Sequence, residues 1–269
     1  MSEVLYSFAD GAAVAKRNLI KIKRVPEVLV FVLISPIMFV LLFAYVFGDS
    51  IPIADPGINY REFLIGGIFA QTVIFGATFT GAGLAEDMQK GIIDRFRSLP
   101  MSRSAVLVGR TGSDIVYNVL SLAIMSITGL LVGWRIRSSL TDAVVGFLLL
   151  LLFAYAFSWI MAYVGLLVPS VEVINNASFI VIFPVTFIAN TFVPLENLPG
   201  PLRTFAEWNP VSAVTQAVRE SFGNVGAMPL PESVWSQRNP VAYTLIWVVI
   251  ILAVFVPLSV RQYKRASTK

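Results

Sequence analysis

The sequence predicts an all-α integral membrane protein with six transmembrane helices. Its 269 residues are 57% hydrophobic and only 13% charged, with a mean hydropathy of +0.78, a balance that water-soluble domains do not reach. The charged residues are clustered, and long uncharged windows separate the clusters. The absence of Cys and His excludes disulfides, thiolate nucleophiles and the usual zinc ligand sets. We therefore expect no catalytic site and no metal site in this chain.

Six windows without Asp, Glu, Lys or Arg reach 20 residues or more, about the length of a helix that crosses the hydrocarbon core. The spans are placed at residues 28–47, 63–85, 108–134, 143–168, 173–195 and 240–260. Only Glu172 separates the fourth window from the fifth, and Pro169 and Ser170 favour a tight turn there over one long helix. The whole chain, residues 1–269, is then a single transmembrane domain.

The distribution of Lys and Arg predicts the orientation of the spans. Fourteen of the 20 basic residues lie before the first span, between the second and third, or after the last. With six spans these three regions share one side, so both termini are expected in the cytoplasm. Arg135 and Arg137 oppose this pattern, because the connection that carries them then faces outward. No cleavable signal peptide is expected, since the first apolar block is too long for one.

The segment before the first span, residues 5–25, predicts an interfacial amphipathic helix. Apolar and basic residues recur at helical spacing on two different faces. The apolar face is formed by Phe8, Ala12, Ala15, Leu19 and Ile22, and the basic face by Arg17, Lys21 and Arg24. Such a helix lies along the cytoplasmic surface, with its basic side near anionic headgroups. The alternative is a positively charged flank that only fixes topology, and the apolar face argues against it.

The connection at residues 86–104 predicts a short amphipathic helix on the cytoplasmic side. Acidic residues lead and basic residues follow, which suits the helix macrodipole, and Pro100 ends the helix. Its apolar face is formed by Met88, Ile92, Phe96 and Leu99. This face meets either the lipid surface or another protein. A protein partner is favoured because Phe96 is an aromatic anchor flanked by the charged residues Asp94, Arg95 and Arg97.

The outward segment, residues 196–239, is rich in Pro and Gly but contains one helix signal. Asn209 and Pro210 have the order of an N-cap followed by proline at the first helical position. Apolar residues then repeat at helical spacing up to Gly223, namely Val211, Val214, Val218 and Phe222. This helix is expected to lie on or dip into the outer leaflet, with Arg219 and Glu220 on its water-facing side.

These two connections, in this order among six spans, resemble the membrane subunit of ABC-2 type transporters over essentially the whole chain. The cytoplasmic pattern of that family is matched by Glu86, Gly91, Ile92, Asp94, Leu99, Pro100, Ser102 and Arg103. The outer pattern is matched by Phe192, Val193, Pro194, Leu195, Glu196, Asn197, Leu198 and Pro199, and then by Asn209, Pro210, Val211 and Arg219. The run from Gly91 to Pro100 is most similar to the daunorubicin/doxorubicin-resistance permeases. Asn190 and Thr191 depart from the family, where Ser-Gly is common.

The resemblance implies a mechanism and a set of partners. Two permeases pair, this chain with itself or with a paralogue, and each rests its cytoplasmic coupling helix in a cleft of one of two copies of an ATP-binding subunit. The residues implied in that contact are Glu86, Gly91, Ile92, Asp94, Arg95, Phe96, Arg97, Leu99 and Pro100. No G-x-x-x-x-G-K-[ST] motif occurs in this sequence, so ATP and Mg are expected on the partner. The location implied is the bacterial plasma membrane, with lipids and a hydrophobic substrate as further partners and no nucleic acid.

The function expected is that of an ABC exporter permease that moves a hydrophobic or amphiphilic drug or lipid outward. Export of a polysaccharide or lipid-linked glycan is the alternative within the family. A secondary transporter would require carboxylates within the spans. Asp114 is the one such candidate, and an ion pair with Arg110, four residues earlier, is the expectation for it. Polar residues in the spans are expected to hydrogen-bond between helices rather than to bind substrate, namely Gln71, Asn118, Asn175, Asn176 and Asn190.

Overall fold

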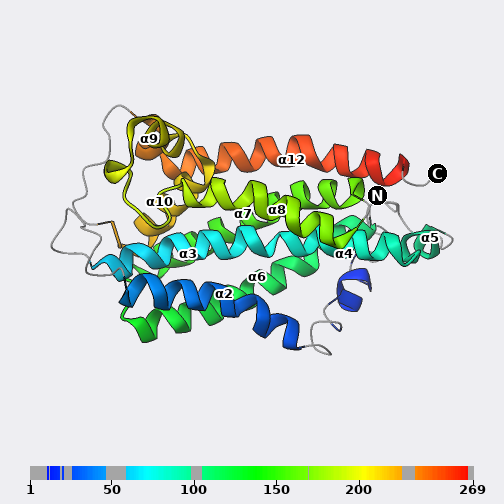
Figure 1. The fold of residues 1–269 in the computed structure, drawn as a ribbon, viewed down its shortest axis with the longest axis horizontal. Coiled ribbons are helices and arrows are strands. Elements are labelled where there is room, and N and C mark those ends of the chain that lie inside the picture. Colours follow the sequence, from blue (N-terminus) through cyan, green and yellow to red (C-terminus); the bar gives the residue numbers. More distant parts are fainter. Residues whose placement is uncertain are drawn as a thin grey trace.

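The computed structural model of the chain is helical throughout its core and describes residues 11, 13–18, 20, 26–46, 59–97, 105–168, 170–225 and 234–265. The longest helices run side by side along the long axis of the molecule (Figure 1). Helix α5 (Ile92–Arg97) and the last turn of α12 (Pro240–Arg265) lie at one end, here called the α5 end. Helices α9 (Gly200–Glu207) and α10 (Pro210–Phe222) lie at the opposite, α10 end.

Four helices in the described part of the chain are long and apolar enough to cross a membrane. They are the 30-residue stretch Tyr60–Gln89, which consists of α3 (Tyr60–Gly76) and α4 (Thr78–Gln89), and helices α6 (Ala105–Val132), α7 (Leu140–Leu167) and α12. Two further apolar helical segments are shorter, Pro36–Tyr45 within α2 (Pro26–Tyr45) and α8 (Val171–Phe187). The protein is thus a helical, multi-pass membrane protein. The count of six spans stays a prediction.

Helix α8 ends at Phe187, whereas the sequence predicted a span that continued to residue 195. The apolar run does continue, but its residues are buried against protein, as the exposed fractions of Ala189 (1%) and Phe192 (2%) show. The break lies just before Asn190 and Thr191, where the sequence departs from the family pattern. Hydrophobicity alone does not distinguish a residue covered by lipid from one covered by neighbouring helices, which explains the difference.

The turn between α7 and α8 is as tight as predicted. Helix α7 ends at Leu167, and Ser170 caps the next helix by accepting a hydrogen bond from the backbone N–H of Val173 at 3.3 Å. Pro169 lies outside the described residues. Helix α7 also packs closely against α4 where two glycines meet. A Cβ on Gly165 of α7 would lie 2.5 Å from the carbonyl oxygen of Gly81 on α4. Small residues of this kind permit close contact between membrane helices.

A cluster of aromatic rings fills the interior of the α10 end. The Phe69 ring contacts Trp134 edge-on at 5.3 Å between centroids and Phe222 at 5.8 Å. Phe147 completes the cluster, 4.9 Å from Phe222. Edge-to-face contacts of this geometry add to the stabilisation from burial alone. The cluster joins α3, α7 and α10 with Trp134 after α6, so these elements form one packed unit at this end.

Candidate functional site

The amphipathic helix predicted in the connection at residues 86–104 is divided by Gly91, so the prediction that Met88 shares one helix with Ile92 and Phe96 is wrong. Helix α4 ends at Gln89, and the N–H groups of Lys90 and Gly91 close its last turn by donating to the carbonyls of Glu86 and Met88, each at 3.0 Å. Gly91 has φ of +63°, the left-handed conformation that glycine adopts after a helix. The short helix α5 starts at the next residue.

Helix α5 is anchored in the protein by Ile93, which is not on the apolar face predicted from the helical spacing. Ile93 is 3% exposed and packs in a cluster with Leu84 and Leu107. Ile92 and Phe96, the predicted apolar face, are half-buried, and Arg95 is exposed. The turn at Gly91 resets the helical phase, which is why the buried residue differs. Four motif residues, Leu99, Pro100, Ser102 and Arg103, and the side chains of Asp94 and Arg97 lie outside the described part.

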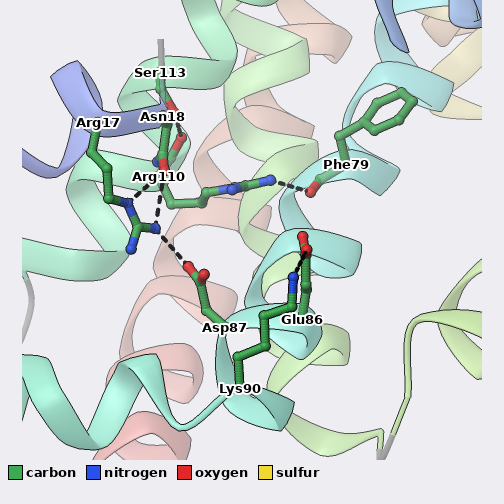
Figure 2. Close-up of polar contacts among 8 residues, drawn as sticks. All are labelled: Arg17, Asn18, Phe79, Glu86, Asp87, Lys90, Arg110 and Ser113. Atoms are coloured by element: carbon green, nitrogen blue, oxygen red, sulfur yellow. Dashed lines mark hydrogen bonds and ion pairs between the residues drawn. The ribbon is translucent and has the colours of Figure 1, made fainter. Parts of the chain in front are cut away.

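Polar contacts join the N-terminal helical segment to α4 and α6 (Figure 2). A nitrogen of Arg17, Nη2, lies 2.7 Å from Oδ2 of Asp87 at the end of α4. The same guanidinium lies over the Phe96 ring, 5.0 Å from its centroid. Asn18 donates from Nδ2 to the Ser113 hydroxyl on α6 at 3.2 Å. The adjacent residues Arg17 and Asn18 therefore join the N-terminal segment to α4, α5 and α6 at the α5 end.

The N-terminal segment packs on protein where the sequence predicted an interfacial helix with its apolar face in lipid. Val14 and Asn18 are 3% and 6% exposed. A Cβ on Gly109 would lie 2.5 Å from the carbonyl oxygen of Gly11, so the segment approaches the start of α6 at backbone distance. Ala15, from the predicted apolar face, is half-buried, and Arg17, from the predicted basic face, pairs with Asp87. The other predicted face residues, Phe8, Ala12, Leu19, Lys21, Ile22 and Arg24, lie outside the described part.

Glu86, the acidic residue of the family motif, belongs to α4 and pairs with Lys90. The Lys90 ammonium lies 2.6 Å from Oε1 of Glu86, at i,i+4 spacing on the surface. The hydrogen bond and the negative charge of Glu86 raise the pKa of Lys90. An exposed pair of this kind contributes little to stability. Its position next to the Gly91 turn puts two charges of opposite sign beside α5.

The predicted ion pair between Arg110 and Asp114 is not the contact that the structure has. Arg110 donates from Nη2 to the Phe79 carbonyl on α4 at 2.7 Å, and Asp114 accepts from the hydroxyl of Thr80. Gly83 is the reason, because a Cβ there would lie 1.9 Å from Arg110 Nη2. The guanidinium therefore lies along α4, as Figure 2 shows for Arg110 and Phe79.

The predicted helix in the outer segment is present as α10. The Oδ1 atom of Asn209 caps it by accepting from the Val211 N–H at 2.9 Å, Pro210 is its first residue, and Gly223 ends it with φ of +71°. The other motif residues start shorter helices in the same segment. Pro194 precedes the 3₁₀ turn η1 (Leu195–Asn197), Leu198 follows this turn, and Pro199 precedes α9.

Arg219 lies in the interior, although the sequence predicted it on the water-facing side of α10. It is 0% exposed and donates to three backbone carbonyls, from Nε to Phe63 at 2.8 Å and from Nη2 to Asn190 at 2.9 Å and Thr191 at 3.1 Å. Its guanidinium also lies 3.4 Å from the centroid of the Phe63 ring. Glu220 is exposed, as predicted.

The early end of α8 explains the position of Arg219. The backbone after a helix end carries carbonyls without helical partners, and a cation satisfies them well. Gly66 makes room, since a Cβ there would lie 2.7 Å from Arg219 Cγ. The adjacent glycines of α3, Gly66 and Gly67, are the sequence signal that was available for this contact.

Arg137, which opposes the predicted orientation, has a structural partner. Its Nε lies 3.0 Å from Oε1 of Glu62, a carboxylate whose residue is 3% exposed. The Arg137 N–H also donates to the Phe222 carbonyl at 2.8 Å. A buried carboxylate needs a paired charge, so this arginine is required locally whatever its effect on topology. Within the described residues no group of three or more acidic side chains is arranged to hold a metal ion.

Comparisons with known proteins cover most of the chain. Residues 11–222 match the family profile described as ABC-2 type transporter. The chain is 32% identical over 251 residues to the daunorubicin resistance ABC transporter permease protein DrrB1 of Streptomyces coeruleorubidus, which covers 93% of this chain and 84% of that protein. It is 25% identical over 239 residues to the probable doxorubicin resistance ABC transporter permease protein DrrC of Mycobacterium tuberculosis, covering 88% and 81%. It is 22% identical over 220 residues to the inner membrane transport permease YadH of Escherichia coli, covering 78% and 82%. The profile match includes both α5 and α10.

Proposed function

The chain belongs to the ABC-2 type transporter family, and we propose that it is the membrane subunit of an ATP-driven exporter that moves a hydrophobic or amphiphilic drug or lipid outward. Two relatives carry names that refer to daunorubicin or doxorubicin resistance, which supports a drug-like substrate. The energy comes from a separate ATPase subunit, present in two copies. A second permease, the same chain or a paralogue, completes the complex.

The geometry of α5 is the observation that carries this proposal. Gly91 sets the short helix off from α4, Ile93 anchors it in the core, and Arg95 faces solvent. Arg17 joins it to the N-terminal segment through the Asp87 ion pair and the Phe96 contact. A partner that moves α5 therefore also moves α4 and the elements tied to it. This is what a subunit that receives mechanical work from an ATPase requires.

The orientation follows from the same assignment. The α5 end faces the cytoplasm, where the ATPase is, and the α10 end faces outward. Helix α12 supports this orientation, because its last turn carries Lys264 and Arg265 at the α5 end, in agreement with the preference for basic residues on the cytoplasmic side. Both termini are then cytoplasmic, and the membrane is the bacterial plasma membrane.

Removal of the half-buried ring of α5 tests the docking step. We expect Phe96→Ala to reduce co-purification of the partner ATPase at least about tenfold, because an aromatic anchor at an interface contributes a large share of its binding energy. The control is Phe205→Ala, which removes an exposed ring (48%) at the α10 end. Both variants are expected in the membrane at normal levels. ATPase recovery that is equal for Phe96→Ala and the unmodified chain contradicts the proposal.

The source of energy is tested by transport in proteoliposomes. The complex of permease and ATPase is expected to move an amphiphilic dye when ATP is present and a protonophore has collapsed the proton gradient. Transport by this chain alone, without nucleotide and driven by a proton gradient, would instead identify a secondary transporter and overturn the proposal.

A further inference from the structure

Helices α3 and α4 together form a rod that lies antiparallel along α6, and one register holds over its length. Each step along the rod towards the α5 end is matched, to within one residue, by a step back along α6. The facing pairs are Ile65 with Gly129, Gly76 with Asn118, Thr80 with Asp114, and Gly83 with Arg110. Polar residues occupy the middle of this interface, near Ala77, which separates α3 from α4 and itself has helical backbone angles.

These residues form a buried polar seam, defined here as Thr72, Thr80, Asp114, Asn118 and Ser121. Their exposed fractions are 5%, 0%, 8%, 2% and 1%, in that order. Thr72 lies one turn before Gly76 on α3, and Ser121 lies one turn after Asn118 on α6. Polar and ionisable side chains within membrane spans are costly, and they mark functional positions by default.

Several hydrogen-bonding atoms of the seam have no partner. Asn118 uses its Nδ2 to donate to the Asp114 carbonyl at 2.9 Å, and its Oδ1 has no partner within the described chain. The hydroxyl of Thr72 also has no hydrogen-bond partner within the described chain. The hydroxyl of Ser121 has no hydrogen-bond partner on another described helix. Unpaired buried polar groups carry a free-energy cost. Among these atoms the amide oxygen of Asn118 is an acceptor, like the carboxylate of Asp114.

Among the described residues, Arg110 is the cation on the same helix as these acceptors, and its Nη2 hydrogen bond goes to α4. Arg110 lies one turn closer to the α5 end than Asp114 and donates to the Phe79 carbonyl at 2.7 Å. Two aromatic rings lie beside the seam, those of Phe79 and Tyr117, with centroids 5.4 Å apart. Aromatic faces attract cations and cover apolar chains. The surroundings thus combine acceptors for a charged head with rings for the adjoining hydrocarbon.

We propose that the polar seam binds the ammonium group of a cationic amphiphilic substrate when α6 separates from α3 and α4. The proposal rests on the proposed export function, whose substrate class it narrows. In the present structure the seam is closed. Helix α4, which follows Ala77, carries both Thr80 and the connection to α5. A movement of α5 therefore reaches the seam through a single short helix.

The test compares two fluorescent probes that differ only in charge. The first is dansyl-1,12-diaminododecane, which has a free ammonium group, and the second is dansyl dodecylamide, which has none. Binding is measured on the permease–ATPase complex in nanodiscs of phosphatidylcholine. We expect the ammonium probe to bind more tightly than the neutral probe. Asp114→Asn should raise the Kd of the ammonium probe at least about tenfold, because a charge-assisted hydrogen bond is lost. The Kd of the neutral probe should stay unchanged.

Three further variants separate this role from a structural one. Asn118→Leu keeps the side-chain size and removes the free acceptor, so it should weaken the ammonium probe alone, by less than Asp114→Asn. Asn175→Leu, an exposed asparagine on α8, is the matched control and should change neither probe. If Asp114 only neutralises Arg110, the double variant Arg110→Gln/Asp114→Asn regains the affinity of the unmodified chain, which would overturn the proposal. We expect the double variant to stay deficient.

Equal Kd values for the two probes on the unmodified complex would also overturn the proposal, and this comparison requires no variant to fold. The outcome for the export function is read separately from ATP-driven efflux of both probes. If neither probe is exported, the export function is contradicted while the binding data still decide the seam. If both are exported equally and Asp114→Asn changes nothing, only the seam proposal fails.

Discussion

The two ends of the rod formed by α3 and α4 are held by different kinds of contact. At the α10 end, Arg219 is fully buried and bonds to backbone carbonyls of α3 and of the segment after α8. At the α5 end, the Arg17 side chain that joins three elements is 38% exposed, and its ion pair with Asp87 is between side chains. Buried bonds to a charged group contribute about 1.5–3 kcal/mol each, whereas exposed ion pairs contribute about 0.2–1 kcal/mol.

The difference indicates that the α10 end is fixed and that the α5 end can change its contacts. Backbone carbonyls cannot turn away from a buried arginine, so the α10 end is built to keep one arrangement. At the α5 end the Arg17 side chain reaches solvent, although its partner Asp87 is 7% exposed, so this side chain changes its contacts at lower cost than Arg219. An exporter driven from one end requires this asymmetry, since the driven end must accept a partner while the far end keeps its fold.

The largest effect is expected for Arg219→Leu. The substitution keeps an apolar side chain in place but leaves three buried carbonyls without their donor, which should lower the free energy of unfolding by about 3–5 kcal/mol. Denaturation of the detergent-solubilised chain measures it. Arg203→Leu on α9 is the control, because it removes a partly exposed i,i+4 pair with Glu207 and should cost less than about 1 kcal/mol. Equal losses at the two positions would remove the asymmetry described above.

A smaller effect at the same end is expected for Gly67→Ala. The new Cβ would lie 2.2 Å from the Thr191 carbonyl oxygen, so α3 and the segment after α8 must separate, at a cost of about 1–3 kcal/mol. Gly112→Ala on α6 is the matched control, since nothing lies within 4 Å of its Cβ position and alanine favours helix by up to about 1 kcal/mol. The melting temperatures of the two variants should therefore move in opposite directions. A Gly67→Ala chain as stable as Gly112→Ala would show that the close approach is not important.

The smallest effect on stability is expected at the α5 end, for Arg17→Glu. Because the Arg17 side chain is 38% exposed, this change should lower the free energy of unfolding by about 1 kcal/mol or less, and Asp87→Arg should cost more because Asp87 is 7% exposed. ATP-driven efflux by the complex should fall in both single variants because α5 loses its tie to the N-terminal segment. The double variant restores the pair with reversed charges and should recover efflux. Failure of the double variant to recover, with both singles well folded, would show that the pair does not transmit movement.

Most of the helices could be predicted from uncharged windows, and α10 could be predicted from its cap. Asn209, Pro210 and Gly223 are local signals whose meaning depends on the backbone nearby, and they survive without tertiary information. The early end of α8 could not be found in this way. Residues 188–195 are as apolar as a span, and only the helices that cover them distinguish a packed loop from a membrane helix.

A helix in the connection at residues 86–104 could be predicted from the sequence, but its geometry could not. The spacing of Met88, Ile92 and Phe96 fits one helix, and a single glycine in such a pattern is compatible with a helix. The left-handed turn at Gly91 is therefore visible only in the structure, and with it the burial of Ile93. Arg219 was misplaced for a related reason, since an arginine beside a glutamate is typical of a water-facing surface unless orphan carbonyls lie within reach.

The central claim, that the ATPase subunit binds this chain at α5, is tested most directly by cross-linking. The sequence contains no cysteine, so Arg95→Cys on the exposed side of α5 and Thr204→Cys on the exposed side of α9 each create a single reactive site. With a short photoactivatable reagent on that cysteine, the assembled complex should cross-link to the ATPase from position 95 and not from position 204. An assembled, ATP-hydrolysing complex without any cross-link from position 95 would contradict the account.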